Sequence, residues 1–350
     1  MKKKKTPLNA AALAPQAAYE PQAGDFERVE RNLDEFVDEN FSGQSYLREM
    51  FHSLFKNKGA AVSLVLIALI VLMAIFAPMF SPYSYRDVND EATNLPMRIP
   101  LLEDLGIFDG TRNGVDMYEA AGVKDEYHYF GTDSLGRDIW TRVWEGTRIS
   151  LLISLLAVVL DVVVGVTYGL ISGYFGGKVD MVMQRIVEVL MGIPNLIIMT
   201  LLLLVMEPGI LTICLALMIT GWINMSRIVR AQVLRLKNNE YVLASRTQGA
   251  KAMRIIFKDI LPNTLGQIII TFMFSVPNAI FFEAFLAFIG LGVPIPMASL
   301  GTLINDGYKS ALLYPSQVLL PILVLSVLML SFNLLADGLR DAIDPQMRNV

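Results

Sequence analysis

The side chains in this sequence that could do chemistry are few, and three of them are acids inside apolar sequence. Asp161, Glu188 and Glu283 each interrupt a long apolar block. An ionisable group in apolar surroundings is costly, so it marks either a functional group or a charge that needs a partner. For Asp161 the sequence leaves both interpretations open, a structural pairing and a functional role.

Several common kinds of catalytic site are missing from the sequence. A P-loop needs Gly, four residues and then Gly-Lys-Ser/Thr, and the nearest approach, Gly-Gly-Lys-Val at 176–179, lacks the first Gly and the hydroxyl residue. His52 and His128 both stand outside the apolar blocks, and Cys214 is the only cysteine, so neither a zinc cluster among the blocks nor an intrachain disulfide is predicted. We therefore expect no catalytic residue, no metal site and no cofactor bound by this chain.

The elements that must position these residues are long apolar helices. Apolar residues make up 54% of the chain and charged residues 18%, against roughly 45–50% and about 25% in soluble domains. The excess collects in blocks that near or reach the roughly 20 residues that a helix needs to cross a bilayer core. We predict an all-α polytopic membrane protein with six transmembrane helices, at residues 59–80, 149–172, 186–206, 209–225, 264–293 and 316–336.

The distribution of Lys and Arg predicts how the chain crosses the membrane, because basic residues concentrate in cytoplasmic loops. Lys2–Lys5, Lys56 and Lys58 precede the first span, so the N-terminus is expected inside, and six spans return the C-terminus to the same side. Periodic apolar residues from Phe26 predict an amphipathic helix in the N-terminal tail. The predicted segments are a cytoplasmic tail at 1–58, an extracytoplasmic loop at 81–147, a helical core at 148–345 that includes a cytoplasmic loop at 226–263, and a cytoplasmic C-terminal tail at 337–350.

Small residues and prolines predict how the spans pack and bend. Gly165, Gly169 and Gly173 recur every four residues in the second span, a spacing that lets another helix approach closely. Proline removes a backbone hydrogen bond and kinks a helix. Prolines interrupt the third, fifth and sixth spans, at Pro194, Pro277 and Pro321.

The loop between the fourth and fifth spans carries the most informative pattern. Two short helical segments are predicted around Gly249, which supplies a permissive backbone conformation at the joint. Met253, Phe257 and Ile260 are predicted to form one apolar stripe among basic residues. Such a segment is suited to docking on another protein.

This loop resembles the one in the integral membrane subunits of ABC importers, which carries Glu-Ala-Ala, three residues, Gly, nine residues and Ile-x-Leu-Pro. Leu243 stands where that frame has Glu, and Asp259 where it has Ile. The residues that fall on the frame are Leu243, Ala244, Ser245, Gly249, Leu261 and Pro262.

Further segments sharpen the resemblance. Residues 128–142 read His-Tyr-Phe-Gly-Thr-Asp-Ser-Leu-Gly-Arg-Asp-Ile-Trp-Thr-Arg, and the segments at 146–151, 172–185, 282–292 and 332–345 match in the same way. They are similar to the C-type integral membrane permease subunits of oligopeptide and dipeptide ABC importers. The similarity runs from about residue 50 to the C-terminus, and it leaves the N-terminal tail and the stretch from about 90 to 124 unexplained.

The resemblance implies a type I ABC importer permease fold and a chain that forms half of a translocation pathway for peptides in a bacterial cell (inner) membrane. It implies a homologous B-type permease, two ATP-binding cassette subunits that bind ATP and Mg, and an extracytoplasmic substrate-binding protein as partners, beside membrane lipid and the peptide. ATP hydrolysis is then expected in the partner subunits. The net charge of −4 argues against a nucleic-acid partner.

The resemblance also implies roles for particular residues. The ATPase-coupling loop would comprise Leu243, Ala244, Ser245, Arg246, Gly249, Lys251, Arg254, Leu261 and Pro262. For Arg246 and Lys251 a solvated basic face is the alternative. Candidates for the pathway or for a subunit interface are Asp161, Asn278, Phe282 and Glu283.

Two other functions are compatible with apolar helices. The same kind of importer could carry nickel or another small solute, because nothing in these residues identifies the cargo. A secondary transporter driven by an ion gradient would use a buried acid as its proton site and would show internal repeats. The sequence has no convincing repeated halves, and the basic loop would have no task in such a transporter.

Overall fold

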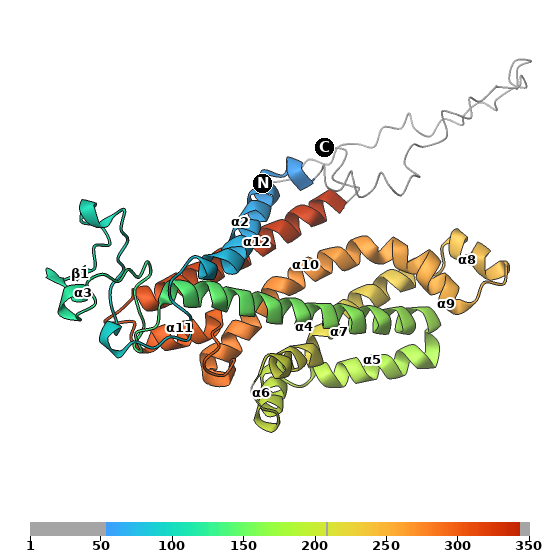
Figure 1. The fold of residues 1–350 in the computed structure, drawn as a ribbon. Coiled ribbons are helices and arrows are strands. Elements are labelled where there is room, and N and C mark those ends of the chain that lie inside the picture. The colour runs from blue at the N-terminus through green and yellow to red at the C-terminus, as the bar shows by residue number, and fades with distance from the viewer. Residues whose placement is uncertain (1–53, 208, 344–350) are drawn as a thin grey trace, which may run out of the picture. The chain divides into compact units, whose positions relative to one another are not determined.

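The computed structural model describes residues 54–207 and 209–343, and all of them lie in one compact unit (Figure 1). The predicted amphipathic helix of the N-terminal tail and the last residues of the C-terminal tail lie outside the described residues. The longer helices are α2 (Lys58–Phe76), α4 (Ile139–Phe175), α5 (Gly177–Met191), α6 (Asn195–Val205), α7 (Ile210–Leu236), α10 (Leu261–Leu286) and α12 (Ser316–Ile343).

Shorter elements connect them. Strands β1 (Thr111–Arg112) and β2 (Val115–Asp116) form an antiparallel hairpin. The short helices are α3 (Met117–Ala120), α8 (Glu240–Thr247), α9 (Ala252–Arg254) and α11 (Leu300–Lys309), with 3₁₀ turns at Ala77–Met79, Asp90–Ala92 and Glu103–Leu105 and π-helical turns at Ile255–Ile260 and Ala287–Leu291. In Figure 1 the hairpin and α3 lie at one end of the helices, and α8 and α9 lie at the other. We call these the hairpin end (residues 81–138) and the loop end (residues 237–260).

Five helical stretches of the described chain are long and apolar enough to cross a membrane, and α5 with α6 forms a sixth span if the bent pair is counted as one. This confirms the predicted all-α fold with several membrane-spanning helices. The stretches are Lys58–Met79, Ile139–Phe175, Ile210–Leu236, Ala252–Leu291 and Ser316–Ile343. Lys58–Met79 agrees with the predicted block at 59–80 to within one residue at each end, and the other four extend beyond their blocks at one end or at both.

The third predicted span, at 186–206, is not one straight helix. α5 ends at Gly192, and α6 begins after Pro194. The two helices meet at an angle of 81°. Proline explains the break, because it lacks an N–H and disfavours helical geometry in the residue before it. α10 and α12, in contrast, continue through Pro277 and Pro321.

The closest helix pair is α4 with α7, and the predicted glycine ladder makes it possible. A Cβ added at Gly165 would lie 2.6 Å from the carbonyl oxygen of Trp222, and one added at Gly169 would lie 2.6 Å from that of Ser226. Neither distance leaves room for a side chain. The prediction that these glycines admit another helix is therefore confirmed.

The other spans pack around this pair. α10 contacts α4, α7 and α12, and α2 lies along α12, as Figure 1 shows. Apolar side chains such as Ile67 of α2 and Leu335 of α12 fill the contact between the last two. α5 lies along α4 and α7, α6 turns away from the bundle, and most side chains of both helices are exposed.

The hairpin end is a small folded segment with its own apolar cluster of Ala92, Leu95, Tyr118 and Val123. Burial raises the pKa of the Tyr118 phenol above its ordinary value, so the group stays neutral and donates a hydrogen bond to the carbonyl oxygen of Pro96 (2.8 Å). Buried polar contacts fix the segment to the helices. The side-chain amide of Gln317 on α12 donates to the carbonyl oxygen of Thr132 (2.9 Å).

Candidate functional site

The loop end is a short helical pair held firmly on the helices beneath it. α8 begins after Asn239, and the chain reverses at Gly249, whose φ of +81° lies in the left-handed region that favours glycine. Val242 of α8 and Ile255 and Ile256 of the following turn are buried in one cluster with side chains of α7. A force applied to this pair therefore reaches α7 and α10 directly.

The outward surface of the loop end is apolar in part. Met253 is 60% exposed and Phe257 is 54% exposed, and Tyr241 and Leu243 are exposed on α8. Ile260 is fully buried, so the predicted stripe is wrong at its last member. The reason is the π-helical turn at Ile255–Ile260, which departs from the period of 3.6 residues that the prediction assumed.

Cationic side chains surround these apolar groups. Arg246, Lys251 and Arg254 are all exposed, and the Arg246 guanidinium lies 5.8 Å from the centre of the Tyr174 ring at the end of α4. The other loop residues named from the sequence lie in the same place: Ala244 is exposed, Ser245 is half-buried, and Leu261 and Pro262 form the first turn of α10. The structure thus gathers all nine predicted loop residues at one end of the bundle.

Glu283 lies where α4, α10 and α11 meet, with 0% of its surface exposed. The Ser150 hydroxyl donates a hydrogen bond to Glu283 Oε2 (2.8 Å) and accepts one from the backbone N–H of Leu300 (3.1 Å). Oε1 has no hydrogen-bond partner among the described residues. The carboxylate therefore joins three helices inside this chain.

Asp161 is the second buried acid, in the middle of α4 and 8% exposed. Its carboxylate lies against Gly221 of α7, where an added Cβ would overlap the carboxylate oxygens. No described basic residue pairs with it, and Oδ1 has no hydrogen-bond partner in the described chain. Asp161 and Glu283 thus occupy separate helix junctions.

The two remaining candidates differ in exposure. Asn278 of α10 is exposed, and its side-chain amide donates to the carbonyl oxygen of Phe274 (3.1 Å). Phe282 is partly buried against the cluster around Leu286 and Leu217. Asn278 is therefore the only one of the four predicted pathway or interface residues with an exposed side chain.

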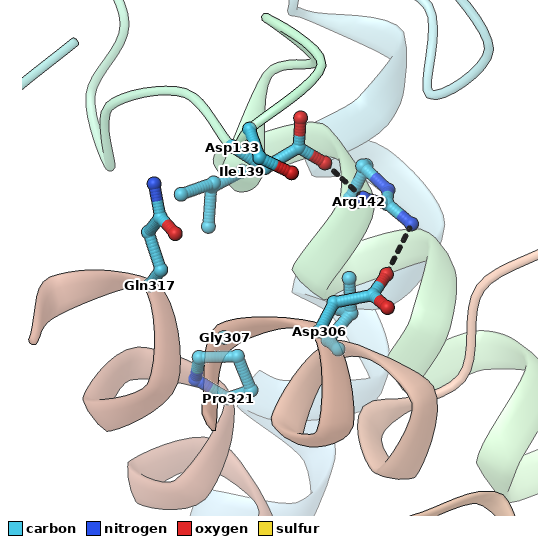
Figure 2. Close-up of a pocket in the computed structure, with 9 residues that line it drawn as sticks. Asp133, Ile139, Arg142, Asp306, Gly307, Gln317 and Pro321 are labelled. Carbon is cyan, nitrogen blue, oxygen red and sulfur yellow. Dashed lines mark hydrogen bonds and ion pairs between the residues drawn. The ribbon is translucent and has the colours of Figure 1, made fainter. Parts of the chain in front are cut away.

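The sequence did not reveal a largely buried ion-pair network at the hairpin end, and Figure 2 shows the part of it around Arg142. Asp133 pairs with Arg137 (2.7 Å) and with Arg142, and both arginines also face Asp306 of α11, at 3.6 and 3.7 Å. The network borders a cavity of about 20 Å³, enough for a water molecule. It ties the hairpin end to α4 and α11. The nearest signal in the sequence was the matching segment at 128–142, which contains three of the four residues.

A second unpredicted feature lies on α5. Arg185 Nη1 and Glu188 Oε2 form an ion pair at 2.6 Å, and their side chains are 78% and 60% exposed. Glu188 stood out in the sequence as an acid in an apolar block, but its partner lies just outside that block. No cluster of His, Cys, Asp and Glu that could hold a metal ion occurs in the described part of the chain.

Comparison with known proteins identifies the family. Residues 165–349 match the model of the "binding-protein-dependent transport system inner membrane component", and residues 45–96 match that of the "N-terminal TM domain of oligopeptide transport permease C". The chain belongs to this family of transport components. The resemblance predicted from the loop and the matching segments is thereby confirmed, and with it the permease fold.

Individual relatives cover almost the whole chain. It is 43% identical to the oligopeptide transport system permease protein OppC of Bacillus subtilis, over 95% of this chain and 98% of that protein. It is 43% identical to the dipeptide transport system permease protein DppC of the same organism, over 87% of each chain, and 39% identical to OppC of Escherichia coli K12, over 89% of this chain and 96% of that protein. An inward-facing structure of the MetNI methionine ABC transporter aligns with a TM-score of 0.48 at 17% identity, over 57% of this chain and 94% of that one.

Proposed function

We propose that this chain is one of two permease subunits of a peptide importer powered by ATP, and that it forms half of the translocation pathway. The loop end carries the proposal: it is a firmly anchored helical pair with an uncovered apolar and cationic surface. The chain that bears it has relatives named as oligopeptide and dipeptide permeases. Such a surface fits an ATPase subunit. Packed elements switch between discrete arrangements, so movement of that subunit would shift the helices that hold the loop end.

The proposal assigns a side and a partner to each end. The loop end lies in the cytoplasm with both chain termini, and two ATP-binding cassette subunits that hold ATP and Mg dock beneath the two permeases. The hairpin end lies outside a bacterial cell membrane, where a binding protein delivers the peptide. A homologous B-type permease supplies the other half of the pathway. The basic residues of the loop support this orientation.

The loop end can be tested with a single substitution. Phe257→Asp places a charge in the proposed contact with the ATPase, so it should reduce the amount of ATPase that co-purifies with the permeases and the ATPase activity that peptide-loaded binding protein stimulates. Val88→Asp, at an exposed position of the hairpin end and outside the spans, is the matched control for the same change away from the loop end. Equal ATPase recovery and stimulation in Phe257→Asp and wild type would contradict the proposed docking site.

The cargo is tested separately, by uptake of labelled peptide in cells that lack other peptide importers. Peptide uptake that requires this chain supports the proposal. Uptake of nickel or another small solute in its place would overturn the cargo and leave the permease role standing.

A further inference from the structure

The stretch at 99–108 in the hairpin end is a loop whose two ends lie side by side. Arg98 and Asp109 pair across its base as an isolated antiparallel bridge. The Arg98 guanidinium also forms an ion pair with Glu103 inside the loop (2.9 Å). Compact loops with neighbouring ends are frequently functional. This one belongs to the stretch from about 90 to 124 that the resemblance to known permeases left unexplained.

The loop exposes several large apolar side chains. Leu101, Leu105, Ile107 and Phe108 are all exposed, Leu101 over 86% of its surface. None of the four joins a buried apolar cluster of the described chain. Single exposed apolar residues are normal on a protein surface, but a group of them marks an interaction site.

The backbone that presents the Phe108 ring is strained. Its φ of +55° lies in the left-handed region, which is rare and costly for an aromatic residue. The backbone N–H of Ile99 donates a hydrogen bond to the Phe108 carbonyl oxygen (3.0 Å), which helps to fix this conformation. Strain of this kind is found at ligand clamps and other functional positions. The apolar surface of the loop is therefore preorganised.

The charge around the loop selects among the possible occupants of this surface. The hairpin end carries twelve Asp and Glu against five Lys and Arg. Asp104 is exposed on the loop, whereas Arg98 is paired with Glu103, and the Arg112 guanidinium lies 4.4 Å from the centre of the Tyr314 ring. Lipid surfaces attract basic segments, and a second copy of this acidic segment would be repelled. A protein surface with an apolar centre and a basic rim fits.

We propose that the loop at 99–108 is a docking site for the peptide-binding protein, which contacts it through such a surface. The site rests on the proposed function, in which the hairpin end and the binding protein lie on the same side of the membrane and the N-terminal tail lies on the other. The ion pairs of Asp133 and Asp306 tie the hairpin end to α4 and α11. A protein bound to the loop is therefore held in place relative to these helices.

Phe108→Gly tests the surface and the fold separately. Glycine adopts a positive φ freely, so the unfolding temperature of the assembled complex should not fall. Loss of the ring should raise the Kd of the purified, peptide-loaded binding protein for the complex about tenfold, as for a residue central to an interface. Val88→Gly changes an exposed apolar residue of the hairpin end outside the loop, and as the control it should leave the Kd unchanged.

Two results of this measurement would overturn the proposal. One is an unchanged Kd in Phe108→Gly. The other is a higher Kd together with a lower unfolding temperature, which would make Phe108 part of the fold and not of the docking surface.

Reversal of a charge tests the basic rim of the partner. Asp104→Lys should raise the Kd several-fold and make it less dependent on salt, because attraction between opposite charges is screened by ions. Asp90→Lys makes the same change at an exposed position of the hairpin end outside the loop and should have a smaller effect. Equal effects of the two reversals would show that only the net charge of the segment matters, and that the loop is not the contact.

Photo-crosslinking identifies the occupant. Ile107 is replaced by p-benzoylphenylalanine in the assembled complex, and Val88 is replaced in the same way as the control. Illumination with peptide-loaded binding protein present should join position 107, and not position 88, to that protein. An adduct of position 107 with the second permease, with another copy of this chain or with lipid would overturn the proposal.

Failure of the docking site and failure of the proposed function give different results. Binding and ATPase stimulation that survive Phe108→Gly unchanged would remove this site alone. A wild-type complex whose ATPase no peptide-loaded binding protein stimulates, and which takes up no peptide, would contradict the proposed function.

Discussion

At the scale of single residues, the buried acids owe their surroundings to helix packing. Glu283 reaches α11 through Ser150, whose hydroxyl lies between the carboxylate and the N–H of Leu300. The carboxylate is close to the start of α11, where the helix dipole favours a negative charge. Asp161 has no such bridge and is held against Gly221.

Removal of the Ser150 hydroxyl should therefore destabilise the chain. Ser150→Ala leaves two buried groups, Glu283 Oε2 and the Leu300 N–H, without this partner, and each unsatisfied buried group costs about 1–3 kcal/mol. We expect a lower unfolding temperature of the purified complex. Thr167→Ala, an exposed hydroxyl on the same helix that bonds only to the Val163 carbonyl, is the control. Equal unfolding temperatures for the two variants would contradict this account of Glu283.

The contact between Asp161 and Gly221 can be examined with a double-mutant cycle. Gly221→Ala places a methyl group in the space of the carboxylate, so it should lower the unfolding temperature. Asp161→Ala in the same chain removes the overlap and should recover most of the loss, which appears as a coupling energy of about 0.5–3 kcal/mol. Gly209→Ala at the start of α7, where an added Cβ meets nothing, is the control and should have no effect. Additive effects of the two substitutions would show that the contact is not made.

At the scale of elements, the sequence predicted what depends on local pattern and failed where distant segments meet. The apolar blocks and the ladder at Gly165 and Gly169 are local, and both predictions agree with the helices that form. The buried position of Ile260 depends on a π-helical turn that hydropathy does not encode. The ion pairs from Asp306 to Arg137 and Arg142 join residues more than 160 positions apart. The spacing of apolar residues along the sequence does not predict such contacts.

The network at the hairpin end should behave as a buried clamp. Asp133→Asn weakens the pairing of Arg137 and Arg142 in a site that is almost fully buried, and breaking a buried pair costs about 3–5 kcal/mol. We expect faster proteolysis of residues 81–138 in membranes and a lower unfolding temperature. Lys124→Ala breaks the exposed pair with Glu119 and is the control, with an expected effect of about 0–1 kcal/mol. A protease pattern for Asp133→Asn that matches wild type would show that the network does not hold the segment.

At the scale of the whole molecule, the chain is built to work with other subunits. One end carries an uncovered apolar and cationic surface, the other a folded polar segment, and α5 and α6 expose many apolar side chains. The exposed apolar surface at the loop end lies outside the apolar blocks, and such a surface marks an interaction site. The central claim is therefore that transport needs this chain together with a second permease and an ATPase.

The most direct measurement is peptide uptake into proteoliposomes that contain this chain, the second permease and the ATPase subunits, supplied with binding protein and ATP. The account predicts accumulation of labelled peptide that requires ATP and is lost when this chain is omitted. Uptake by this chain alone, driven by an ion gradient and indifferent to ATP, would contradict it.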